Sequence, residues 1–257
     1  MLSDDLRATL GSWRTLLPTV WRGRFDDVEL PFEKVPSLPG GPIWPQNVFR
    51  AFRDVAPSNV RAVIFGNDPY TQPEQATGRS FEQGDISSWK AHFGTRATQS
   101  LKGLMQAVVL TKHPSIPRAQ VAGRIAAGKI ALPSPKTVWP SWGKQGVLWL
   151  NTTLTFTKWD DAHRAAHRQL WAPFTARVLR VLVEEARERP VAFVLWGVPA
   201  KALEKRILRE RDAVGADADH VRIVKAGHPV VAGFFGNGNP LTNINAALGR
   251  PAIKWLP

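Results

Sequence analysis

Four short apolar runs, each ending in polar or glycine residues, constrain the fold of this chain more than any other feature. The runs occupy residues 61–65, 146–151, 191–197 and 221–224. The run at 146–151 is continuous rather than alternating, which is typical of a strand in a parallel sheet that is covered on both faces. Helical patterns follow the four runs over residues 98–111, 171–187, 199–211 and 241–248. This alternation predicts an α/β fold with three layers, αβα, around a central four-stranded parallel sheet.

The chain before the first strand has a different character. A helix is predicted over residues 2–17, where leucine and tryptophan recur every three or four positions, and residues 30–45 are rich in proline and glycine. A short helix is predicted over 45–52, and residues 112–140 are weakly patterned. Because no linker separates these parts, we expect one domain over residues 1–257, with residues 1–45 forming an N-terminal helix and a proline-rich wrap.

Composition narrows the classes of function. The chain has no cysteine, which excludes disulfides, iron–sulfur clusters, thiolate zinc sites and thiol nucleophiles. No apolar run reaches the roughly 18 residues of a membrane span, and the N-terminus lacks a signal-peptide pattern. We therefore expect a cytoplasmic protein. Its net charge of +13 favours a polyanionic partner, of which nucleic acid is the usual one; the alternative is a merely basic surface.

Polar residues follow the predicted strands. Asn67 and Asp68 follow the first, Asn151 ends the second, and His228 lies beyond the fourth. Since the carboxyl ends of parallel strands share one edge, these side chains are expected to converge on one crevice. Taken singly, each has a simpler interpretation: Asp68 as part of an Asp-Pro turn, Asn151 as a cap or turn residue, His228 as a loop histidine.

An acid, an amide and an imidazole at one crevice suit the recognition and cleavage of a nucleoside. Asn151 presents a donor and an acceptor that can pair with a base edge. His228 can donate to an oxygen on which negative charge develops. Asp68 can orient water and stabilise an oxocarbenium ion in glycosidic cleavage. Phe81 offers a stacking face, although spacing alone favours a core position for it.

Three motifs in this order resemble those of the family 1 (UNG-type) uracil-DNA glycosylases. Gly66-Asn67-Asp68-Pro69-Tyr70-Thr71 looks like the family's water-activating motif Gly-Gln-Asp-Pro-Tyr-His. Residues 144–155 are similar to the strand that carries the uracil-reading asparagine. His228-Pro229, followed by Gly233-Phe234-Phe235-Gly236, resembles the family's histidine loop. The resemblance covers about residues 45–248 and implies the uracil-DNA glycosylase fold.

The resemblance implies a role for each matching residue in removing uracil from DNA. Asp68 would orient the water and stabilise the sugar cation, and His228 would bond O2 of the departing base. Tyr70 would exclude the methyl group of thymine, Phe81 would stack on uracil, and Asn151 would pair with its N3–H and O4. The product would be an abasic site in base excision repair, with no metal or organic cofactor.

The same resemblance implies contacts to DNA. Ser100 matches a phosphate-binding serine, and Asn67 stands at a substrate-binding position where the family has glutamine. The loop after His228 is several residues shorter than the family's, so its apolar wedge is reduced to Val231, followed by Ala232. A shortened wedge is expected to flip bases from duplex DNA less well, or to suit single strands.

Two other functions stay open at this point. One is a glycosylase for another deaminated or modified base, and the other is a catalytically weak DNA-binding relative. The partner expected in every case is DNA, single- or double-stranded. We expect a monomer associated with the nucleoid, and we expect His163 and His167 on the surface, although an approach to phosphate or to the pocket rim is the alternative.

Overall fold

The sheet has four parallel strands in the order β2-β1-β3-β4. The computed structural model describes residues 1–39, 41–94 and 99–256. The strands are β1 (Ala62–Gly66), β2 (Val147–Asn151), β3 (Val191–Trp196) and β4 (Val221–Ala226). The predicted fold class is confirmed. β2 pairs with one edge of β1 and β3 pairs with its other edge, so the direction in which strands are added reverses at β1. This switch point, between β1 and β3, is where sheets of this kind bind ligands.

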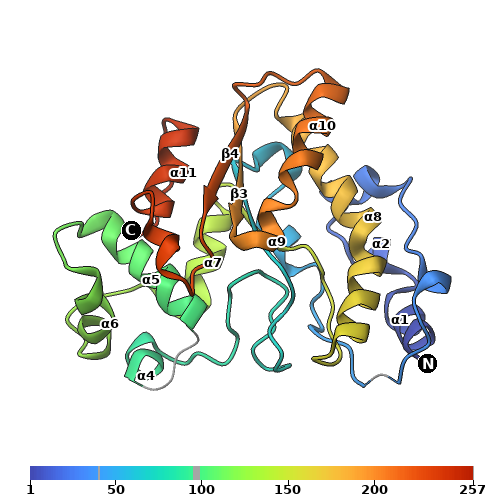
Figure 1. Ribbon diagram of the computed structural model, residues 1–257, viewed down its shortest axis with the longest axis horizontal. Coiled ribbons are helices and arrows are strands. Elements are labelled where there is room, and N and C mark those ends of the chain that lie inside the picture. Colours follow the sequence, from blue (N-terminus) through green and yellow to red (C-terminus); the bar gives the residue numbers. More distant parts are fainter. Residues whose placement is uncertain (40, 95–98, 257) are drawn as a thin grey trace.

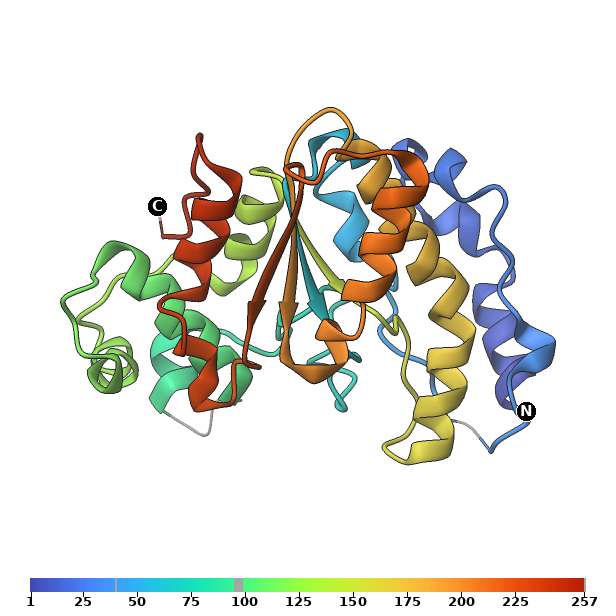
Figure 2. The same cartoon turned by 45° about the horizontal axis from the view of Figure 1, so that its top comes forward.

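Helices cover both faces of the sheet (Figures 1 and 2). One layer contains α5 (Gln99–Lys112), α6 (Arg118–Ala126), α7 (Pro135–Gly143) and α11 (Pro240–Leu248). The other contains α1 (Leu2–Leu10), α2 (Trp13–Leu16), α8 (Asp161–Glu185) and α10 (Glu204–Val214). The shorter helices are α3 (Thr19–Arg22), α4 (Trp89–Gly94) and α9 (Gly197–Lys201).

Each face of the sheet has its own hydrophobic core, because successive side chains of a strand point to opposite faces. Val63 and Phe65 of β1 belong to the core under α1 and α8. Ala62 and Ile64 belong to the core under α5, α7 and α11. Burial on both faces is the reason that β1, β2 and β3 read as apolar runs, whereas the edge strand β4 is only partly buried.

The helix boundaries differ from the sequence prediction in several places, one of which is the predicted helix 199–211, which is broken into α9 and α10. The predicted helix 2–17 is broken into α1 and α2 near Gly11, and residues 45–52 form only a 3₁₀ turn, Arg50–Arg53. The weakly patterned segment 112–140 contains α6 and α7. Helix α8 begins ten residues before the predicted start. The prediction missed its first turns because they are polar. The side chain of Asp160 caps the helix by accepting a hydrogen bond from the His163 amide at 2.9 Å. The predicted start of α5, Thr98, lies outside the described residues.

The N-terminal segment packs into the same core as the sheet. Leu2, Leu6 and Leu10 of α1 are fully buried in the cluster that holds Val63 and Phe65. No helix in the described ranges is long and apolar enough to cross a membrane.

The prediction that His163 and His167 lie on the surface is wrong. Their exposed fractions are 4% and 1%, because both lie on the buried face of α8. His163 contacts Asp160 at 2.7 Å and the Pro39 carbonyl at 2.6 Å, and so ties the proline-rich wrap to α8. His167 bonds to the hydroxyls of Thr155 at 2.9 Å and Thr157 at 3.0 Å.

His167 is expected to make stability depend on pH. Burial, and then the nearby His163, lower the pKa of His167 from 6.5 to about 4. Between these values the unfolded chain binds a proton that the folded chain does not, so the free energy of unfolding falls as the pH falls. From pH 7 to pH 5 the contribution of this group is about 2 kcal/mol. Urea denaturation at both pH values should show that much less pH sensitivity in His167→Gln, and an unchanged sensitivity would contradict the assignment.

Candidate active site

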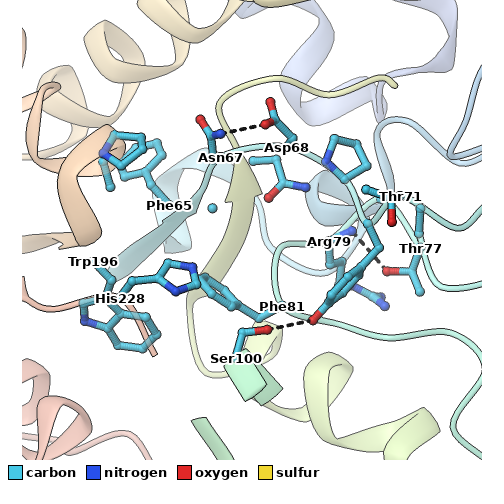
Figure 3. A pocket seen from close by; sticks show the side chains of 18 of the residues that line it. Phe65, Asn67, Asp68, Thr71, Thr77, Arg79, Phe81, Ser100, Trp196 and His228 are labelled. Atoms are coloured by element: carbon cyan, nitrogen blue, oxygen red, sulfur yellow. Dashed lines mark hydrogen bonds between the residues drawn. The ribbon is translucent and has the colours of Figure 1, made fainter. Parts of the chain in front are cut away.

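A pocket of about 290 Å³ opens at the carboxyl edge of the sheet (Figure 3). It is lined by residues that follow β1, β2, β3 and β4, so the convergence expected from the sequence is present. The predicted site residues that line it are Asn67, Asp68, Tyr70, Phe81, Ser100, Asn151 and His228. Its volume is close to that of the smaller ligand sites of proteins.

Asp68 is held by two hydrogen bonds on one oxygen. Its Oδ2 accepts from Asn67 Nδ2 at 2.6 Å and from Arg164 Nη2 at 3.1 Å, and its side chain is 7% exposed. This arrangement fixes the carboxylate and leaves Oδ1 as the oxygen that can accept from a water molecule. A fixed carboxylate here can orient that water and stabilise a positive charge on a bound sugar.

Asn151 ends β2 directly beside Gly66 of β1, its partner in the sheet register. No group in the described ranges hydrogen-bonds to the Asn151 amide, so both its donor and its acceptor are available to a ligand. Gly66 makes room for it, since a Cβ at position 66 would overlap Asn151 Oδ1 and approach Ser80 Cβ to 2.8 Å. The amide therefore depends on the absence of a side chain on the neighbouring strand.

Gly66→Ala is expected to disable base recognition. The new methyl group would push the Asn151 amide out of its position, at the cost of the hydrogen bonds to a base that the sequence resemblance assigns to it. We expect kcat/KM on a uracil-containing oligonucleotide to fall about a hundredfold, as it should in Asn151→Ala. Circular dichroism and the melting temperature control for folding. A folded Gly66→Ala variant with normal kcat/KM would show that Asn151 does not read the base.

Phe81 reaches the pocket from a backbone conformation that side chains seldom adopt. Its φ is +60°, in the left-handed region. The preceding residue anchors the loop to the sheet: the Ser80 amide donates to the Trp149 carbonyl at 3.2 Å, and its hydroxyl donates to the Ile64 carbonyl at 3.1 Å. The edges of Trp149 and Trp196 pack on the Phe81 ring, at 6.2 and 5.7 Å between centroids. A strained residue held in this way at a pocket is a mark of a functional position.

A buried ion network supports the same loop. Arg79 donates to both oxygens of Asp54, at 2.6 and 2.9 Å, and to both oxygens of Glu82, at 3.0 and 2.9 Å. Burial by itself lowers the pKa of Arg79, but the hydrogen bonds and charges of the two carboxylates outweigh it and raise that pKa above its ordinary value. The segment that presents Phe81 is thereby fixed to residues before β1.

His228 lies across the pocket from Asp68 (Figure 3). Burial lowers its pKa below 6.5, which favours the neutral imidazole at pH 7. The Val230 amide donates to Nδ1 at 3.4 Å, so the proton of the neutral ring is on Nε2. Gly197 allows this close packing, since its φ is +83° and a Cβ there would lie 3.1 Å from His228 Cβ. The ring can thus donate one hydrogen bond to a ligand oxygen.

Tyr70 and Ser100 both line the pocket and lie close to each other. Their hydroxyl oxygens are 3.5 Å apart. The Tyr70 carbonyl accepts from Trp44 Nε1 at 2.8 Å, and Trp44 pairs through its backbone with Phe156 in the segment after β2. The proline-rich wrap therefore helps to position Tyr70, a contribution that its sequence did not reveal.

Val231 and Ala232 are the predicted site residues that do not line the pocket. They lie on the exposed turn after His228, which is closed by a hydrogen bond of 2.9 Å from the Val231 amide to the His228 carbonyl. Trp159 and Arg164 are among the lining residues that sequence reasoning missed. The pair Asp160-Asp161 is a helix-start signal that could have placed Arg164 in the first turn of α8.

Comparison with known proteins agrees with this geometry. Residues 52–248 match the family model described as the uracil DNA glycosylase superfamily. A uracil-DNA glycosylase of Bacillus subtilis is 32% identical over 218 residues, which cover 82% of this chain and 79% of the relative. One from Streptococcus pneumoniae is 30% identical over 255 residues, 95% of this chain and 98% of the relative.

Solved structures show the same fold. The wild-type UNG crystal structure from Nitratifractor salsuginis superposes with a TM-score of 0.69 at 22% identity, over 98% of this chain and 96% of that one. The mimivirus uracil-DNA glycosylase gives a TM-score of 0.66 at 19% identity, over 94% of this chain and 88% of that one.

Proposed function

Because this chain belongs to the uracil DNA glycosylase superfamily, we propose that it hydrolyses the N-glycosidic bond of uracil in DNA and leaves an abasic site for base excision repair. The observation that carries this proposal is the convergence of Asp68, Asn151 and His228 on one pocket that also holds Phe81. A water molecule adds to C1′ of the sugar, and uracil leaves with the electron pair of the broken C1′–N1 bond. No metal or organic cofactor takes part in this scheme.

Three residues have distinct roles in the proposed reaction. Asp68, fixed through Oδ2, orients the water and stabilises the oxocarbenium ion. Neutral His228 donates from Nε2 to O2 as negative charge develops on the departing base. Asn151 pairs with N3–H and O4 of uracil, and its unoccupied donor and acceptor support that role.

The remaining predicted residues select the base and hold the DNA. Phe81 stacks on uracil, and Tyr70 occupies the space that a methyl group on C5 would need. Asn67 contributes to substrate binding by fixing Asp68. We assign Ser100 to a phosphate, and the exposed turn with Val231 and Ala232 to the DNA strand beside the flipped nucleotide.

The net charge of +13 supports a salt-dependent grip on DNA phosphates that does not depend on sequence. Because this net charge favours binding to DNA and disfavours self-association, we propose that the protein associates with the nucleoid in the cytoplasm and acts as a monomer. We further propose one domain over residues 1–257, supported by the core that residues 1–45 share with the sheet.

Release of free uracil from single- and double-stranded oligonucleotides tests the function directly. Matched oligonucleotides with 5-hydroxymethyluracil or hypoxanthine test the alternative of another base, which the comparisons do not favour. We expect uracil to be released at least a hundredfold faster than either, because both differ from uracil at groups that Tyr70 and Asn151 face. A folded protein that releases no base from any of these substrates would be a DNA-binding relative.

A further inference from the structure

Trp159 is the one aromatic side chain in the described ranges that is exposed, with an exposed fraction of 61%. It lies at the mouth of the pocket, which it lines together with Arg164. An exposed aromatic ring at the mouth of a pocket offers a flat face on which a base can stack. Trp159 has no role in the proposed reaction.

The backbone around Trp159 is fixed on both sides. On one side, His167 bonds to the hydroxyls of Thr155 and Thr157, and Phe156 pairs with Trp44 through hydrogen bonds of 2.9 and 3.1 Å. On the other side, the next residue is the N-cap of α8. Little conformational freedom is therefore lost when a ligand contacts the indole ring, which favours binding.

The ring itself is supported from within the protein. The Arg164 guanidinium carbon lies 4.3 Å from the ring centroid, and the Phe156 ring lies 5.8 Å away. Arg164 also bonds to Asp68. The remaining indole surface faces solvent, and the preceding residue, Lys158, is exposed and basic. Aromatic rings flanked by cations are the usual means of binding single-stranded nucleic acid.

We propose that Trp159 stacks on the base next to the uracil when the substrate is single-stranded DNA. This rests on the proposed function, since the pocket must hold the uracil of the same strand. In a single strand the neighbouring base is free to stack on the indole, whereas in a duplex it is paired and stacked on its own neighbours. The short turn after His228 offers only two exposed valines, so this opposite rim supplies the larger contact surface.

The test compares Trp159→Ala with wild type on two single-stranded oligonucleotides. One carries ordinary bases on both sides of the uracil, and the other carries tetrahydrofuran abasic residues there. On the first, we expect Trp159→Ala to raise KM about tenfold and to leave kcat within about twofold, while Trp159→Phe stays close to wild type. On the second, wild type and Trp159→Ala should have the same KM, because no neighbouring base remains to stack.

An equal rise in KM on both oligonucleotides, or no rise on either, would overturn the inference. A fall in kcat at constant KM would also overturn it, since Trp159 would then act through Arg164 on Asp68. Val20→Ala is the matched control, because Val20 is also 61% exposed but does not line the pocket. Absence of uracil release by wild type would contradict the proposed function instead, so the two failures are distinguishable.

Discussion

Replacing Asp68 by asparagine is expected to slow uracil excision about a thousandfold. The substitution keeps the shape of the side chain but removes the negative charge that would stabilise the sugar cation. It also leaves the Arg164 guanidinium, 3.1 Å from Oδ2, without its buried anionic partner. Single-turnover assays give the rate of the chemical step. Fluorescence anisotropy with an oligonucleotide of 2′-fluoro-2′-deoxyuridine, which resists cleavage, should show DNA binding close to that of wild type.

Asp161→Asn is the matched control for this experiment. Asp161 is fully exposed and lies 4.0 Å from the same guanidinium, so its substitution removes a carboxylate near Arg164 without touching the pocket. We expect excision within about twofold of wild type, since exposed ion pairs contribute little. If Asp68→Asn and Asp161→Asn had the same rates, the catalytic role of Asp68 would be wrong.

His228→Ala is expected to lower kcat by a factor of about 100 to 1,000, which is the usual cost of losing one donor to a developing oxyanion. His228→Gln should retain more activity than His228→Ala, because its amide can still donate to O2 of uracil. His113→Ala, which removes an exposed histidine outside the pocket, should have no effect. Equal activities of the alanine and glutamine variants would show that hydrogen-bond donation is not the function of this side chain.

The same residue leads to an expectation for pH. Burial lowers the pKa of His228 below 6.5, so the ring is neutral at pH 7 and stays neutral as the pH rises. The single-turnover rate should therefore change little through titration of His228 between pH 7 and pH 8. A mechanism that needed the imidazolium would instead give a rate that rises roughly tenfold as the pH falls from 8 to 7, and His228→Gln would abolish that rise.

The order of the strands along the chain and seven of the residues that line the pocket could be predicted from the sequence. Continuous apolar runs separated by helical patterns indicate buried parallel strands, and parallel strands place their carboxyl ends on one edge. For that reason the sequence predicts that Asp68, Asn151 and His228 lie close together, although they are far apart in the chain. The helix that carries Arg164 was harder to predict, because its first turns lack an apolar stripe and Pro173 lies inside it.

Contacts between distant segments were decided only by the tertiary structure. The bond of Arg164 to Asp68, the positive φ of Phe81 and the burial of His167 depend on which elements pack together. The exposed position of Trp159 at the pocket mouth has the same origin. The sequence by itself determined which chemical groups stand at the sheet edge, because strand ends are local features. Tertiary packing determined which of those groups are fixed by hydrogen bonds, which have a strained backbone and which stay exposed where DNA could contact them. These properties depend on spatial neighbours that no local sequence pattern specifies.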